Sequence, residues 1–69
     1  MNENSNFAAL RNFKALLKEV GNTKDFAKKV GIHLTYVSLI TREKRKIGPV
    51  IAAKIETAFN KPPGWIYKL

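Results

Sequence analysis

Residues 23–41 read TKDFAKKVGIHLTYVSLIT, and no other part of the chain restricts the possible folds as strongly. Thr23 is a suitable N-cap for a short helix, and Gly31 can adopt the left-handed backbone conformation that ends it. Helical spacing resumes near His33, directly after the glycine turn. The stretch therefore predicts two short helices joined by a tight turn.

The apolar residues of this stretch stand where two steeply crossing helices would meet. Ala27, four residues before Gly31, is small enough to allow a close approach. Val37 and Ile40 have the spacing that packs the second helix onto the first. This is the pattern of the helix-turn-helix unit, whose second helix enters the major groove of DNA. The apolar set is completed by Phe26, Val30 and Ile32.

Helical periodicity continues on both sides of residues 23–41. Upstream, we expect a helix capped by Ser5 or Asn6, with Gly21 ending it. Downstream, Gly48-Pro49 favours the start of another helix, and Pro62-Pro63-Gly64 forces a turn before a last short element. The expected buried faces consist of Phe7, Leu10, Phe13, Leu16, Leu17 and Val20 upstream, and of Ile51, Ile55, Ala58 and Phe59 downstream.

Length supports the same architecture. We expect residues 1–69 to form one domain, with a polar lead over residues 1–5 and the helix-turn-helix motif over residues 23–41. The chain has no cysteine, so disulfides and Cys-ligated zinc cannot stabilise its small core. The predicted fold class is all-α, a compact bundle of about four to five short helices packed through their apolar faces.

Charge points to a polyanionic partner. The chain carries 13 Lys and Arg against 5 Asp and Glu, a net charge of +8, which favours nucleic acid or an anionic membrane surface. A membrane-surface protein would have one long amphipathic helix, whereas this pattern distributes its apolar faces over several short ones. We expect no membrane partner, no signal peptide and a cytoplasmic location.

The sequence contains no pattern typical of catalysis. His33 is the only histidine, and the acidic residues lack both the spacing of paired carboxylates and a phosphate-binding glycine loop. We therefore expect no enzyme activity, no cofactor, no metal and no small-molecule ligand. Two functions remain: DNA binding, and a protein-interaction module on the same helical fold that does not bind DNA.

The chain resembles the phage Cro/cI-type helix-turn-helix proteins, the XRE or lambda-repressor-like family, over roughly residues 7–67. The resemblance implies a five-helix domain that binds operator DNA, at an inverted repeat and as a homodimer at least on DNA, in a bacterial cell or phage-infected host. Such domains are often fused to a self-cleaving peptidase, so the chain is either a stand-alone regulator or an excised domain. The matching segments are residues 26–31, Val37-Ser38, Ile47-Gly48, residues 53–56 and residues 62–66.

The same resemblance assigns base contacts to the start and second turn of the helix at about residues 33–41. Hydroxyls of Thr35 and Ser38 could hydrogen-bond to base edges, and Leu34 and Leu39 would suit thymine methyl groups. Each has a structural alternative: His33 could simply start the helix, and the leucines could extend the core. The implied base contacts are His33, Leu34, Thr35, Ser38 and Leu39.

Phosphate contacts are expected around this helix, where they would fix orientation without reading sequence. The basic run at residues 42–46 follows the helix directly, although a solvated loop is its alternative reading. For Tyr36 the alternative is packing. The expected phosphate contacts are Thr23, Lys24, Tyr36, Arg42, Lys44, Arg45 and Lys46.

The end of the chain concentrates apolar residues, namely Trp65, Ile66, Tyr67 and Leu69. They could plug the small core or form a dimer contact. We favour the plug for Trp65 and leave the dimer surface open.

Overall fold

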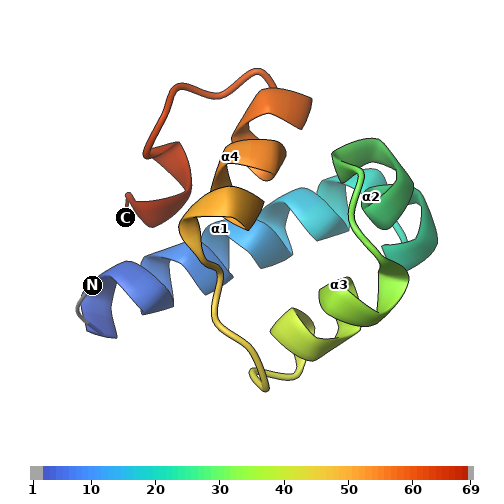
Figure 1. Ribbon diagram of the computed structural model, residues 1–69, viewed down its shortest axis with the longest axis horizontal. Helices are drawn as coiled ribbons and strands as arrows, with labels where there is room; N and C mark the ends of the chain where they lie inside the picture. Colours follow the sequence, from blue (N-terminus) through green and yellow to red (C-terminus); the bar gives the residue numbers. More distant parts are fainter. Residues whose placement is uncertain (1–2, 69) are drawn as a thin grey trace.

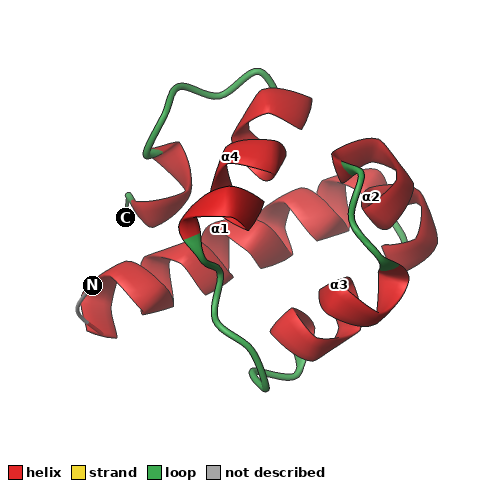
Figure 2. Cartoon of the chain, in the orientation of Figure 1, coloured by secondary structure: helices red, strands yellow, loops and turns green. Residues whose placement is uncertain are grey.

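The computed structural model describes the backbone of residues 3–68 and the side chains of residues 6–68. Its α-helices are α1 (Glu3–Val20), α2 (Thr23–Val30), α3 (Leu34–Thr41) and α4 (Pro49–Ala58), followed by the short 3-10 helix η1 (Trp65–Tyr67) (Figure 1). Residues 3–68 contain no strand (Figure 2), so the all-α prediction is confirmed. Within the same range, no helix is long and apolar enough to cross a membrane.

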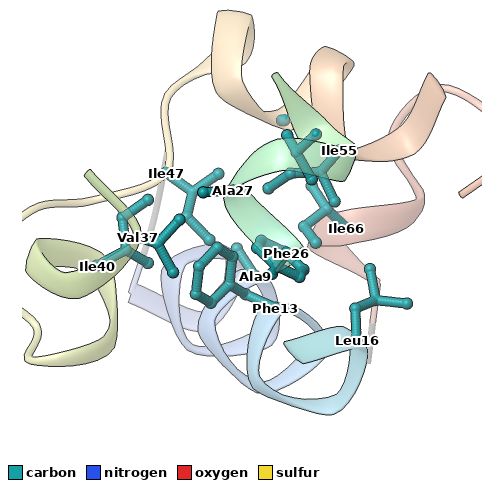
Figure 3. Close-up of a cluster of buried hydrophobic side chains, with 12 residues drawn as sticks. Ala9, Phe13, Leu16, Phe26, Ala27, Val37, Ile40, Ile47, Ile55 and Ile66 are labelled. Atoms are coloured by element: carbon teal, nitrogen blue, oxygen red, sulfur yellow. The ribbon is translucent and has the colours of Figure 1, made fainter. Parts of the chain in front are cut away.

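One cluster of buried side chains holds the helices together (Figure 3). The rings of Phe13 in α1 and Phe26 in α2 meet edge to face, with centroids 5.0 Å apart. From α3, Val37 and Ile40 enter this cluster with exposed fractions of 0% and 1%. Burial of a large apolar side chain contributes about 1.5–3 kcal/mol, so these two residues fix the position of α3 against α1 and α2.

The first helix differs from its prediction in two respects. α1 begins at Glu3, so Ser5 and Asn6 lie inside the helix and do not cap it. Hydrophobic periodicity did not detect the first turn of α1, because residues 3–6 contain no apolar side chain. Phe7 is 64% exposed, whereas Ala8 and Ala9 are buried. Successive helical residues point about 100° apart, so the rotation that buries both alanines turns Phe7 outward.

The C-terminal turn closes the core from the other side. Ile66 of η1 is fully buried, and both of its backbone polar groups are bonded. Its N–H donates to Oε2 of the buried Glu56 at 3.0 Å, and its carbonyl accepts from Nδ2 of Asn12 at 2.9 Å. Ile66 therefore closes the core, and the half-buried Trp65 packs against the same cluster. The predicted dimer contact of Leu69 lies outside the described residues.

Tyr67 adds a second anchor for this turn. Its hydroxyl donates to the carbonyl of Ile47 at 3.0 Å, which ties η1 to the segment that leads into α4. Burial, and secondarily the negative charge of Glu56, raise the pKa of Tyr67 above its usual value. The buried carboxylate of Glu56 was not anticipated from the sequence, because its partner is a backbone N–H in a separate element.

Candidate nucleic-acid interface

The turn between α2 and α3 has the geometry that the sequence predicts. Gly31 is left-handed, with a φ of 82°. Its N–H and that of Ile32 both donate to the carbonyl of Ala27, at 2.9 and 3.1 Å. The chain can therefore reverse within a few residues while the last turn of α2 keeps its hydrogen bonds.

The N-cap of α2 is Asn22, and the prediction of Thr23 is wrong. Oδ1 of Asn22 accepts from the N–H of Asp25 at 2.8 Å, and its Nδ2 donates to Oδ2 of Asp25 at 2.9 Å. Thr23 is instead the first residue of the helix and is exposed. Asparagine is at least as good an N-cap as threonine, and the spacing from Asn22 to Asp25 was the signal available in the sequence.

The N-cap of α3 is His33. Its Nδ1 accepts from the N–H of Thr35 at 3.1 Å, so the helix-start alternative for this residue describes the observed structure. The bond uses Nδ1 only, and the side chain as a whole is exposed. His33 thus lies at the N-terminal end of α3, and its Nε2 takes no part in the capping bond.

None of the five expected base contacts is buried: four belong to α3, and the fifth, His33, is its N-cap. Val37 and Ile40 are the buried residues of the helix, whereas His33, Leu34 and Thr35 are exposed. Leu34 is 44% exposed and so does not extend the core. Ser38 and Leu39 are half-buried. Two hydroxyls and two apolar side chains therefore lie within two turns of one helix.

A sharp reversal follows α3 and keeps the basic loop next to it. Glu43 is left-handed, with a φ of 58°. Its N–H donates to the carbonyl of Ile40 at 3.0 Å, and the N–H of Lys44 donates to that of Leu39 at 2.9 Å, which together form a Schellman motif. The four basic side chains of the loop are exposed: Arg42, Lys44, Arg45 and Lys46.

Tyr36 links α3 to this loop. Its ring is half-buried, in agreement with the packing alternative. The guanidinium of Arg45 lies 5.0 Å from the ring centroid, and its Nη1 donates a long hydrogen bond of 3.4 Å to the Tyr36 hydroxyl. This contact, which the sequence did not indicate, holds one cation of the loop beside α3.

The remaining cations divide between several surfaces. Lys24 is exposed at the N-terminal end of α2, next to the exposed Thr23, a predicted phosphate contact without charge. Lys29 is directed toward the C-terminal end of α4, where its Nζ lies 5.1 Å from the ring centroid of Phe59, the C-cap residue. Arg11, Lys14 and Lys18 are exposed on α1. The basic charge next to α3 therefore comes mainly from residues 42–46.

Comparison with known proteins identifies one matching family. A family model described as helix-turn-helix matches residues 13–66, which is more than half of the chain. The matched range includes α2, its turn, α3 and α4. Comparisons with curated proteins and with solved structures gave no match.

Proposed function

This chain belongs to the helix-turn-helix family of DNA-binding regulators, and we propose that it recognises a specific double-stranded operator through α3. The observation that carries the proposal is the exposed face of α3 beside a basic loop. Residues 33–39 offer hydroxyls and apolar groups suited to base edges, and residues 42–46 add four cations directly after the helix. An α-helix fits the major groove of B-DNA.

The side chains of α3 would contact bases, and those around the helix would contact phosphates. Thr35 and Ser38 would hydrogen-bond to base edges, and Leu34 and Leu39 would contact thymine methyl groups, with His33 at the end of the row. The exposed cations would bind phosphates and so supply affinity and orientation. We assign phosphate contacts to Thr23, Lys24, Tyr36, Arg42, Lys44, Arg45 and Lys46.

We further propose that two copies bind an inverted repeat and that the regulator acts in the manner of a phage repressor or Cro. Two α3 helices entering successive major grooves would be separated by about one helical turn of DNA, roughly 34 Å. Protection of paired half-sites at that spacing in a footprinting experiment supports this arrangement. Protection of single, unpaired half-sites contradicts it.

Salt dependence of duplex binding tests the proposal against a protein-interaction module on the same fold. Each neutralised phosphate contributes about −0.9 to the slope of log K against log salt concentration. Lys44→Ala removes one phosphate contact and should therefore lower the magnitude of that slope by about 0.9. It should weaken binding to all duplexes alike. Lys68→Ala, at the exposed end of η1, is the matched control and should leave the slope unchanged. A flat salt dependence, or no binding at low salt, rejects DNA binding.

A further inference from the structure

Phe7 is an exposed aromatic residue of α1 that does not belong to the core cluster. Its exposed fraction is 64%, and it stands at the edge of a pocket of about 200 Å³ between the start of α1 and the loop after α3. Leu10 of α1 forms one apolar wall, while Ile40 and Ile47 belong to the lining from the other side. Apolar side chains thus line part of the pocket, and Phe7 extends this apolar surface to its edge.

The size of the pocket indicates the kind of group that fits it. Small-molecule sites usually enclose about 300–1,000 Å³, and this pocket is smaller. Protein partners, in contrast, commonly insert a single large side chain into a pocket near the centre of an interface. Phe7 would then widen the contact outside the pocket by packing against the neighbouring part of the partner.

The charge around the pocket distinguishes between possible partners. Arg45 and Lys46 lie on its rim together with one carboxylate, that of Glu43, and residues 42–46 contain four cations for that one acid. Arg11 follows Phe7 by four residues on α1 and so occupies the same helix face. A second copy of a chain with net charge +8 would bring like charges together here, whereas an acidic partner is attracted.

We propose that this pocket docks an acidic protein segment, which inserts one large apolar side chain beside Phe7. Arg45 and Lys46 belong to the pocket rim and also to the phosphate contacts assigned above. The acidic segment and DNA therefore compete for the same cations, and the partner displaces the regulator from its operator. This competition rests on the proposed function, while the docking itself does not.

The test uses a synthetic peptide in which one central leucine is flanked by aspartate and glutamate, and a matched peptide with alanine in place of the leucine. Both are titrated into the full isotope-labelled chain, with backbone amide shifts as the readout. We expect shifts at Leu10, Ile40 and Ile47 with the leucine peptide. Burial of the leucine should make it bind about tenfold more tightly than the alanine peptide.

Two exposed apolar residues provide matched variants of the protein. Phe7→Ala should weaken binding of the leucine peptide severalfold, and Val50→Ala, at an equally exposed position on α4 (68%), should not. Neither change removes a core contact, so both variants should fold. Equal affinity for the two peptides, or equal effects of the two variants, overturns the docking proposal. So do concentration-dependent shifts at Phe7 without peptide, which would identify a second copy as the occupant.

A competition experiment tests the consequence for DNA separately. The leucine peptide should raise the apparent dissociation constant of the wild-type protein for duplex DNA, and Phe7→Ala should bind duplex normally but resist this competition. Peptide docking without any duplex binding would reject the proposed function and leave the docking site standing. Duplex binding that the docked peptide does not disturb would overturn the competition.

Discussion

The guanidinium of Arg45 lies over the ring of Tyr36, 5.0 Å from its centroid, with Nη1 3.4 Å from the tyrosine hydroxyl. Tyr36 belongs to α3, and Arg45 belongs to the loop that follows it. The contact therefore joins the helix that we propose to read bases with the loop that we propose to bind phosphates. It places one loop cation at a defined position relative to α3.

This relationship predicts coupling between the two side chains in DNA binding. Tyr36→Ala should weaken duplex binding severalfold in the wild-type background and by a smaller factor in an Arg45→Ala background, where only the phosphate contact of Tyr36 itself remains to be lost. Cation–π contacts at exposed sites contribute about 0.5–1 kcal/mol, so a double-mutant cycle should show a coupling of that order. Tyr36→Phe keeps the ring and should retain most of the coupling. Strictly additive effects would show that Tyr36 does not position Arg45.

The separation of base and phosphate contacts predicts different outcomes for two exposed residues. Thr35→Ala should change the order of preference among operator variants, because a lost base contact affects one position of the site. Lys44→Ala should weaken all duplexes by a similar factor, because phosphates are alike in every sequence. Competition binding against a panel of single-base operator variants measures both. Uniform losses from both substitutions contradict the assignment.

The N-cap of α2 predicts a stability difference between neighbouring residues. Asn22→Ala removes the acceptor for the N–H of Asp25 and should lower the free energy of unfolding by about 1 kcal/mol. Thr23→Ala alters an exposed first position of the helix and should remain within about 0.5 kcal/mol of the wild type. Denaturant unfolding of the two variants provides the measurement. A larger loss for Thr23→Ala would restore threonine as the cap.

Tyr67 predicts a pH dependence at the alkaline end. Burial raises the pKa of its hydroxyl above the usual tyrosine value of about 10, so the neutral hydroxyl is favoured more in the folded than in the unfolded state. The resulting stabilisation is complete below about pH 10 and is lost as the pH rises through the folded pKa. A Tyr36→Phe background leaves Tyr67 as the only tyrosine, and tyrosinate absorbance should then show a midpoint above 10. A midpoint at or below 10 in the folded protein contradicts the observed burial.

Local signals in the sequence were sufficient for much of the fold. Gly31 ends α2 and Pro49 begins α4, because each acts on the backbone of its own segment. Phe7 shows the limit of periodicity, which defines an apolar stripe but not the rotation that α1 adopts in the core. Glu56 was missed because its burial depends on the N–H of Ile66, and only the tertiary fold brings these groups together.

Part of the candidate interface could likewise be predicted from local sequence, and part depends on the tertiary fold. The exposed face of α3 followed from the inward positions of Val37 and Ile40, which are periodic in sequence. The contact of Tyr36 with Arg45 could not be predicted from sequence periodicity, because it depends on the chain reversal at the left-handed Glu43. A glutamate at such a position is uncommon, so no residue preference pointed to the reversal.

Selection of bound duplexes from a random pool examines recognition by α3 most directly, because one experiment reports binding, sequence preference and symmetry. The wild-type protein should enrich an inverted repeat with half-sites about one helical turn apart, and Thr35→Ala should enrich a repeat altered within each half-site. A pool that remains random after repeated rounds, or an identical motif from Thr35→Ala and the wild type, would contradict base reading by α3.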